Sequence, residues 1–345
     1  MSEKNLAVTI PPFPKRCTLW SMMCFIGYQI LFWLVFAFCE IYSINQLIKL
    51  AISIPYILFF IISTSIGVSL STFYKKSFDF FDGSESNVDR LARRSNEITV
   101  LQFAFTIIVA LFMPLSLKLS CKMNGFNYFP LDAWFGVVGS LFLVSTYFFV
   151  YWLQTFESWL DWLPLRKKNI TMGLVMRHVL VVFTTITATV LLVLLSCRKI
   201  GTDNYQNINE YYLYKMVPVG IFAIIFSVII TINETHHEAK RLSHVVKIME
   251  KMTANDFSIQ REPVQSRDDY GLLATSINRL VSSTKELLQT IKKTALDSSE
   301  RAESLHSGAQ TTAVAITQIV GTIAQIKESV VNQSSGVEEV SASIR

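Results

Sequence analysis

Charged residues are scarce in this sequence. Asp, Glu, Lys and Arg make up 17% of its 345 residues, whereas a soluble domain has about a quarter. The deficit is confined to the part before Ile232, and the segment after Glu234 is polar and rich in Ser, Thr, Glu, Lys and Gln. A single soluble globular domain is therefore excluded. The asymmetry predicts a membrane half joined to a soluble half.

Cysteine is also sparse, and the five residues lack the paired spacing of a metal site. We therefore expect no metal and no cofactor. Three cysteines fall near the outer membrane face under the topology derived below, namely Cys39, Cys121 and Cys197. A disulfide between two of them stays open, although isolated cysteines near lipid are the simpler interpretation. The net charge of +5 lies in short clusters beside apolar runs, which predicts membrane topology rather than nucleic-acid binding.

Six predominantly apolar runs contain no Asp, Glu or Arg in their interior. A helix of about 20 such residues crosses a bilayer, and in lipid its backbone must be hydrogen-bonded internally. The first run is too long for a cleaved signal peptide and no Ala-x-Ala site follows it, so we expect it to be retained. The runs are Thr18–Phe38, Ile52–Phe73, Ile98–Leu117, Ala133–Leu153, Val179–Ser196 and Met216–Ile232.

Lys and Arg are concentrated in two of the five loops. The Tyr74–Glu97 loop carries five and the Gln154–His178 loop carries four, against one to three in each of the others. This excess predicts that both loops and both chain ends are cytoplasmic, in a multi-pass protein of the bacterial inner membrane. Residues 1–17 would form a cytoplasmic tail and residues 18–232 a six-helix sensor region. The outer loops are too short for a folded sensor domain, so the bundle, its loops or a partner would read the stimulus, and the ligand stays open.

The ends of the runs carry aromatic and ionisable residues. Three tryptophans lie near run ends, as in an aromatic belt: Trp20, Trp134 and Trp152. Transporters usually place ionisable residues within the bundle. Here the candidates are Glu40 and Asp132 at run edges, with Pro114 as a kink. This scarcity disfavours transport, which stays only as an alternative function.

The segment after the sixth run predicts two short helices. Apolar residues recur at intervals of three and four from Leu242 to Met252, which indicates an amphipathic helix. It is expected to end near Asn255, a residue type that adopts the left-handed conformation terminating helices. An extended stretch with Pro263 follows. Ser266–Asp269 then offers side-chain caps for a second amphipathic helix from Tyr270.

Residues 233–288 resemble the HAMP module, a relay between membrane spans and output domains. The resemblance is carried by Asn255-Asp256-Phe257-Ser258 and by Arg267-Asp268-Asp269-Tyr270-Gly271-Leu272-Leu273. It implies a parallel four-helix module in a homodimer. The motif residues would be Asn255, Asp256, Phe257, Asp268, Asp269 and Gly271. The chain lacks the family's proline near the start of the first helix and has Asn255 in place of its connector glycine, and Asp268-Asp269 replaces its acid–glutamate pair.

A long heptad pattern follows. From Ile277 to Ile344 apolar or small residues alternate at spacings of four and three without proline, which predicts a coiled coil of nearly ten heptads. Its small residues favour close packing in a four-helix bundle. The sequence lacks the mixture of strand and helix patterns that is typical of a catalytic domain. We therefore expect an all-α protein that is not an enzyme, with no catalytic residues.

Gln333–Ile344 looks like the methylation helix of methyl-accepting chemotaxis proteins, the bacterial chemoreceptors. That resemblance implies methylation at Glu339 with Glu338 as its partner, and Gln325 and Gln318 as secondary sites after deamidation. The heptad register independently places Glu339 and both glutamines at one exposed position. The family's partners would be the chemotaxis histidine kinase, a coupling protein, a methyltransferase and a methylesterase, together with membrane lipids and a second copy of the chain.

The family's kinase-binding hairpin tip does not appear before Arg345. Residues 289–345 would therefore be an incomplete, C-terminally truncated ascending arm, either a fragment of a longer receptor or the product of a truncated gene. We do not expect it to control a kinase by itself. The alternative is a HAMP-linked nucleotide cyclase or histidine kinase. A cyclase or kinase would have only a short helical linker before a globular domain. A kinase linker would also carry a phospho-accepting histidine, and His306 lacks the flanking acid of such a site.

Overall fold

The computed structural model describes residues 10–79, 85–170, 172–197 and 208–344. Within these ranges every regular element is helical, which confirms the all-α fold class. The chain divides into two compact units, Met1–Arg279 and Leu280–Arg345.

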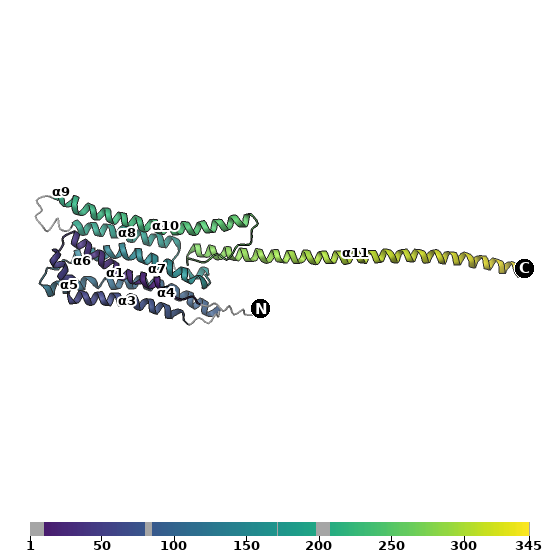
Figure 1. The fold of residues 1–345 in the computed structure, drawn as a ribbon, viewed down its shortest axis with the longest axis horizontal. Coiled ribbons are helices and arrows are strands. Elements are labelled where there is room, and N and C mark those ends of the chain that lie inside the picture. The colour runs from purple at the N-terminus through teal and green to yellow at the C-terminus, as the bar shows by residue number, and fades with distance from the viewer. Residues whose placement is uncertain (1–9, 80–84, 171, 198–207, 345) are drawn as a thin grey trace. The chain divides into compact units, whose positions relative to one another are not determined.

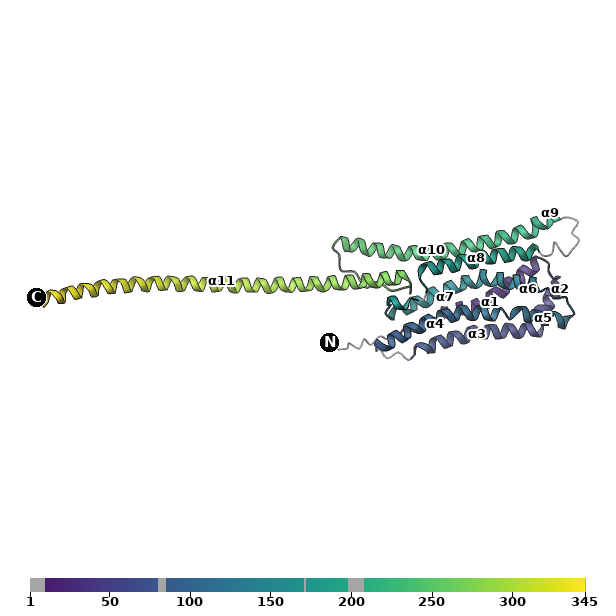
Figure 2. The same cartoon turned by 180° about the vertical axis from the view of Figure 1, so that it is seen from behind.

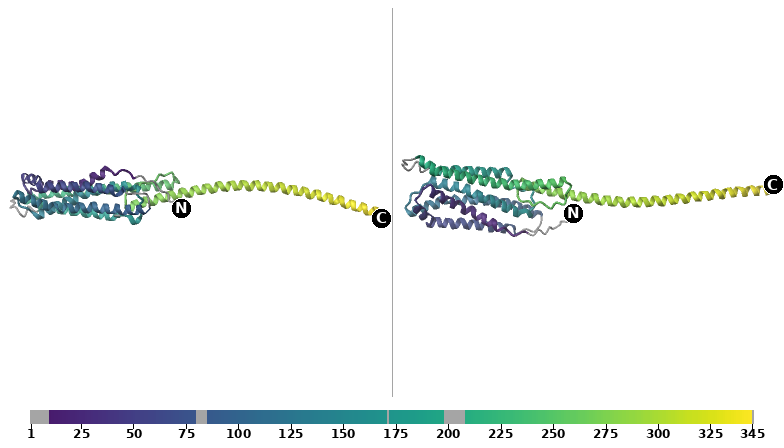
Figure 3. Two further views of the ribbon diagram at one scale, coloured as in Figure 1. Left: turned by 90° about the horizontal axis from the view of Figure 1, so that it is seen from below. Right: turned by 45° about the horizontal axis from the view of Figure 1, so that its top comes forward.

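Six stretches of the first unit are long and apolar enough to cross a membrane, as the apolar runs predict. Several are built from two or more helical segments. Figures 1, 2 and 3 show them lying side by side along one axis. They comprise α1 (Lys15–Phe38); α3 (Ile54–Phe78); α4 (Glu85–Ala110) with α5 (Met113–Asn124); α6 (Pro130–Ser140) with η1 (Leu141–Ser145), α7 (Thr146–Trp159) and η2 (Leu160–Trp162); α8 (Leu174–Cys197); and η5 (Tyr212–Met216) with α10 (Val217–Thr253), which α9 (Ile208–Tyr211) precedes.

Helix α1 supplies much of the core of the bundle. Its Phe25, Phe32 and Phe36 are fully or almost fully buried. Gly136 of α6 brings that helix close to α1, since a Cβ atom on Gly136 would lie 2.4 Å from the Phe36 ring. Such small residues are the usual means by which membrane helices approach closely.

The third span is interrupted. Sequence periodicity predicts one run over Ile98–Leu117, but α4 ends at Ala110 and α5 begins at Met113. Pro114 follows within the first turn of α5. Its ring would clash with the carbonyl four residues earlier, at Ala110, and it has no N–H to continue the α4 ladder. The kink expected at Pro114 therefore takes the form of a break between two helices.

A short helix, α2 (Ile44–Ala51), joins α1 to α3 and was not expected from the sequence. Its start carries a capping box, in which Ser43 Oγ accepts from Gln46 N and Gln46 Oε1 accepts from Ser43 N. Such a box satisfies two amides that the helix leaves without partners. The Ser-x-x-Gln spacing was the signal available in the sequence.

Trp152 is a correction to the expected aromatic belt. It is fully buried and stacks between Phe149 and Phe156. Trp134, by contrast, is 40% exposed. The position of a tryptophan along a span does not determine which face of the helix it occupies, and Trp152 faces the core.

None of the five cysteines, all of which lie in the described part of the chain, forms a disulfide. Cys39 and Cys121 are buried in the bundle, and the Tyr42 hydroxyl lies 3.5 Å from Cys121 Sγ. Cys39 and Cys121 are therefore not bridged, as the simpler interpretation expects, but they lie in the core rather than beside lipid.

Helix α10 continues from its apolar part to Thr253 without a break, and Asn255 follows with a φ of 58°. The helix thus ends at the left-handed residue that the sequence predicts. Residues 256–268, the connector, contain no helix or strand, and α11 (Asp269–Ser343) begins one residue before the expected Tyr270. The last turns of α10 and the first turns of α11 run in the same direction (Figures 1 and 2).

In the second unit, Leu280–Arg345, α11 continues as one helix to Ser343. Heptad residues such as Ile316, Ile323 and Val337 are more than half exposed in the single chain. The long helix is confirmed, and its pairing into a coiled coil stays a prediction.

Candidate functional site

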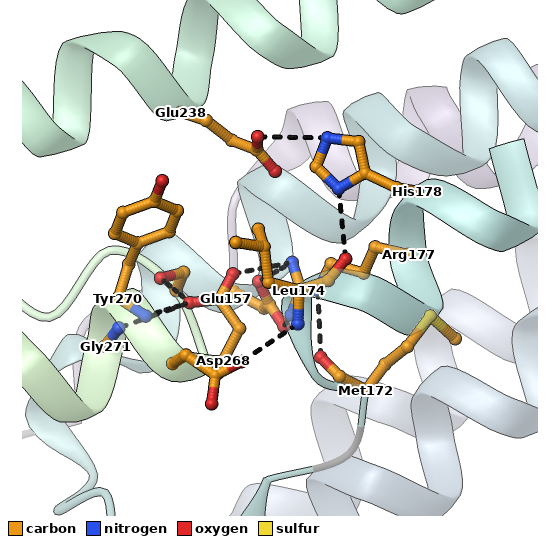
Figure 4. A network of polar contacts seen from close by, with 11 residues as sticks. Glu157, Met172, Leu174, Arg177, His178, Glu238, Asp268, Tyr270 and Gly271 are labelled. Atoms are coloured by element: carbon orange, nitrogen blue, oxygen red, sulfur yellow. Dashed lines mark hydrogen bonds and ion pairs between the residues drawn. The ribbon is translucent and has the colours of Figure 1, made fainter. Parts of the chain in front are cut away.

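Arg177, in the first turn of α8, is at the centre of a buried charge network at the end of the bundle nearest the connector (Figure 4). Its side chain is only 5% exposed. Two guanidinium nitrogens donate to the two oxygens of Glu157 in the last turn of α7, at 2.9 and 2.5 Å. A third, Nε, donates to the carbonyl of Met172 at 3.1 Å. This bidentate geometry uses the planar fork that only arginine provides.

Asp268 joins this pair to the connector. Its Oδ2 lies 3.5 Å from Arg177 Nη1, an ion-pair distance without hydrogen-bond geometry. Its Oδ1 accepts from the amides of Tyr270 and Gly271 and from the Ser266 hydroxyl. Asp268 therefore caps the start of α11 while facing the α7–α8 ion pair. The carboxylate of Asp268 thus links the start of α11 to the ion pair between α7 and α8.

Asp269 makes a second link. Its Oδ2 accepts from Leu174 N at 3.1 Å, and Leu174 begins α8. The first amides of a helix lack intrahelical partners, and here one of them is satisfied by the first residue of α11. The starts of α8 and α11 are thus held together through adjacent aspartates.

Gly271 is required by the local backbone. A Cβ atom there would lie 1.9 Å from the Ser266 carbonyl oxygen, a distance that no side chain tolerates. The connector and the first turn of α11 are therefore in direct backbone contact at this position.

The connector also contacts the loop after α7. Arg267 is 2% exposed, and its Nη2 donates to the carbonyls of Leu160 and Leu163 at 3.4 and 2.7 Å. Burial lowers the pKa of Arg267 to about 10. Asp161 accepts from the amide of Val264 at 2.5 Å and from Arg261 at 3.3 Å. These bonds fix residues 261–268 against the end of the fourth span.

Helix α10 is bonded to the same end of the bundle. His178 Nε2 lies 3.2 Å from Glu238 Oε2, and the Tyr151 hydroxyl donates to Asn233 Oδ1 at 3.0 Å. The Arg241 guanidinium lies 5.8 Å above the Tyr270 ring of α11. Elements from three spans and the connector therefore meet within one polar cluster.

The site residues suggested by the HAMP resemblance divide into two groups. Asp268, Asp269 and Gly271 belong to the network. Asn255 ends α10, and Asp256 Oδ1 accepts from the amide and hydroxyl of Ser258 in a local turn. Phe257 is half-buried. This second group lies just beyond the end of α10 at Thr253.

The four suggested modification sites lie in the second unit, on exposed positions of α11: Gln318, Gln325, Glu338 and Glu339. Nearly every side chain of that unit is exposed, so their exposure does not distinguish them from their neighbours.

Sequence reasoning missed Glu157 and Asp161, and it counted Arg177 only as a topology signal. The available signal was a pair of opposite charges beside the fourth and fifth spans. Glu157 follows the fourth run by four residues and Arg177 precedes the fifth by two. Charges so close to apolar spans are usually paired.

Comparison of the chain with protein-family models, curated proteins and solved structures found no match.

Proposed function

We propose that this chain is a transmembrane signal transducer of the chemoreceptor type, in which a HAMP-like relay connects a six-helix sensor bundle to a methylatable coiled coil. It acts as a homodimer in the bacterial inner membrane, with both termini in the cytoplasm. The observation that carries the proposal is the dual role of Asp268, which caps α11 and faces the ion pair between α7 and α8.

This arrangement supports transmission because α11 begins at the bundle. A displacement of α7 against α8 moves Arg177, and Arg177 holds both Glu157 and Asp268. Since Asp268 Oδ1 is bonded to the first amides of α11, the same displacement changes the cap of that helix. A stimulus read among the spans then reaches the rod without a separate ligand-binding domain.

Helix α10 provides a second route. It is continuous from Val217 to Thr253, so a tilt of its apolar part moves its polar part as well. Its bonds through Asn233 and Glu238 tie that motion to α7 and α8. Coupling free energies between sites are typically about 1–3 kcal/mol, which a change in a few such buried contacts supplies.

Modification of the rod would act on the same equilibrium. Methylation of Glu339 removes one negative charge beside Glu338, and repulsion between exposed like charges is worth a few tenths of a kcal/mol. Several such sites along a bundle with two packing states shift its population and restore the output after a stimulus.

The test is a full-length chain extended beyond Arg345, in heptad register, with the rest of a chemoreceptor signalling hairpin. In membranes from cells without other receptors, we expect this protein to control the chemotaxis kinase. Arg177→Gln and Asp268→Asn should shift kinase activity in the unstimulated state. The matched control is Glu97→Gln, which removes one carboxylate from an exposed ion pair with Arg94 on α4, outside the network.

Kinase activity that is the same with and without the extended chain would reject the proposal. Equal effects of Glu97→Gln and Asp268→Asn would show that the network has no special part in transmission. Ion or solute flux through proteoliposomes of the purified chain would instead favour a transporter.

A further inference from the structure

A cleft of about 870 Å³ opens between α3 and α4, and none of its lining residues belongs to the network around Arg177. Lys76, near the end of α3, lies on one side, and Arg90 and Arg93, near the start of α4, lie on the other. The lining also includes Phe73, one turn before Lys76. The cleft is thus lined by basic side chains and an aromatic ring.

The charge of the lining is unbalanced. Of its two acids, Asp89 pairs with Arg166 at 3.3 Å and Glu97 pairs with Arg94 at 2.8 Å. Lys76, Arg90 and Arg93 take part in no ion pair within the described part of the chain. Three cations that have no ion-pair partner among the described residues therefore line a common cleft.

The placement of these cations suits an anion with several oxygens. Arg90 and Arg93 are three residues apart on α4 and so are neighbours on one helix face. A guanidinium presents a planar fork that matches phosphate, and a lysine adds a point charge from the opposite side. Basic residues tend to gather on one side of a membrane, and this explains why the residues here are positively charged. It does not explain why basic residues of two helices line one cleft.

The apolar wall distinguishes a lipid from a soluble anion. Phe73 is 44% exposed, although it belongs to the apolar part of α3. The Arg94 guanidinium lies 5.6 Å from the centre of its ring. The cleft thus lies where the apolar residues of α3 give way to Lys75 and Lys76, which is the level of lipid headgroups in a spanning helix. A soluble phosphate would gain nothing from Phe73.

We propose that this cleft binds the headgroup of an anionic phospholipid. Lys76, Arg90 and Arg93 contact the phosphate, and Phe73 packs against the glycerol and the first methylenes of an acyl chain. Basic pockets between membrane helices are a recurring means of holding such headgroups. The site requires that α3 and α4 span a bilayer, and it is independent of any signalling role.

The test is native mass spectrometry of the full-length protein released from detergent with either phosphatidylglycerol or phosphatidylcholine added. We expect phosphatidylglycerol adducts on the wild type and few phosphatidylcholine adducts. The triple variant K76Q/R90Q/R93Q should bind phosphatidylglycerol at least about tenfold more weakly, since each basic residue contributes several-fold to anionic-lipid binding. The matched control K49Q/K118Q/K122Q removes three charges from α2 and α5, at the other end of the bundle, and should bind normally.

Loss of basic residues can also change membrane insertion, so a second variant keeps every charge. Ser77→Trp fills the cleft from a half-buried lining position and should reduce phosphatidylglycerol binding as strongly as the triple variant. An unchanged circular dichroism spectrum and gel-filtration volume show that each variant is folded.

Three results would overturn the proposal. Equal loss in the control variant would indicate general attraction between an anionic lipid and a basic protein. Full binding in both Ser77→Trp and the triple variant would place the lipid elsewhere. Displacement of phosphatidylglycerol by an equal concentration of sn-glycerol 3-phosphate would show that the cleft is a site for soluble phosphate esters.

Discussion

Arg177 and Glu157 face each other through two hydrogen bonds, although they belong to different helices and are almost completely buried. A buried pair of this kind is sensitive to the loss of one partner, because the other charge stays desolvated. Asp268, which is fully buried, shares the cation. The connector therefore depends on the same arginine as the α7–α8 contact.

Arg177→Met should destabilise the protein markedly. Removing one partner of a buried pair costs about 3–5 kcal/mol, so the thermal unfolding midpoint in detergent should fall. The double variant E157L/R177M should recover part of the loss, since apolar replacement removes the stranded charge of Glu157. Arg94→Met, at an exposed pair, is the control and should cost less than about 1 kcal/mol. A double variant no more stable than R177M would contradict the role of a stranded charge.

Gly271→Ala should disrupt the start of α11. The added Cβ would meet the Ser266 carbonyl, so the connector must move and Asp268 loses its bonds to the Tyr270 and Gly271 amides. Faster hydrogen–deuterium exchange at these amides would report the change. Gly308→Ala is the control, because nothing lies within 4 Å of its Cβ position. Alanine within a helix should there stabilise by about 0.5–1 kcal/mol. Equal exchange of the amides at positions 270 and 271 in both variants would refute the requirement for glycine at position 271.

Asp161→Ala should release the connector from the loop after α7. The Val264 amide loses its acceptor and Arg261 loses its ion pair. An unsatisfied, partly buried amide costs about 1–3 kcal/mol, so exchange over residues 261–268 should rise roughly tenfold or more. Glu250→Ala, on an exposed position of α10, should leave this segment unchanged. Wild-type exchange in the Asp161 variant would show that other bonds suffice to hold the connector.

Glu339 should carry a methyl ester when the full chain is produced in cells with a chemotaxis methyltransferase. Peptide mass spectrometry should detect the added methylene at Glu339, and Glu339→Ala should abolish it. Gln325 and Gln318 should appear as glutamate or its methyl ester. An unmodified Glu339 in cells that methylate their own receptors would reject Glu339 as a methylation site.

A homodimeric coiled coil predicts that equivalent seam residues of two chains are adjacent. A cysteine at Ile319, on the apolar heptad seam, should form a disulfide between two chains under mild oxidation. Bond formation requires Cα atoms within about 7 Å. A cysteine at Glu328 lies on the outer side of the predicted coiled coil and should cross-link poorly. Equal cross-linking at both positions would argue against the proposed register.

The sequence predicted features that depend on local pattern. The six spans followed from runs of apolar residues, and the end of α10 followed from Asn255, whose left-handed φ of 58° is a local property. The cap at the start of α11 was also accessible, because Asp268 lies within three residues of the Tyr270 and Gly271 amides that donate to it.

The network could not be predicted in the same way. Its pairs join residues distant in the chain, such as Arg267 with the Leu163 carbonyl, 104 residues away. Which helix faces meet is decided by packing among all the spans, and hydropathy does not encode it. The burial of Trp152 and the opening of the cleft beside Phe73 have the same origin, since each depends on the rotation of a helix about its axis.

Bonds on either side of the apolar part of α10 restrict how that helix can move. Near its start, Lys215 donates to the Phe38 carbonyl and to Glu40. Beyond its apolar part, Asn233 and Glu238 are bonded to the neighbouring helices. A slide by one turn, about 5.4 Å, would break both sets of bonds, whereas bowing of the exposed stretch between them would preserve both. Under the proposed signalling role, a change in bilayer thickness or lateral tension would act on that stretch and reach the connector as a bend.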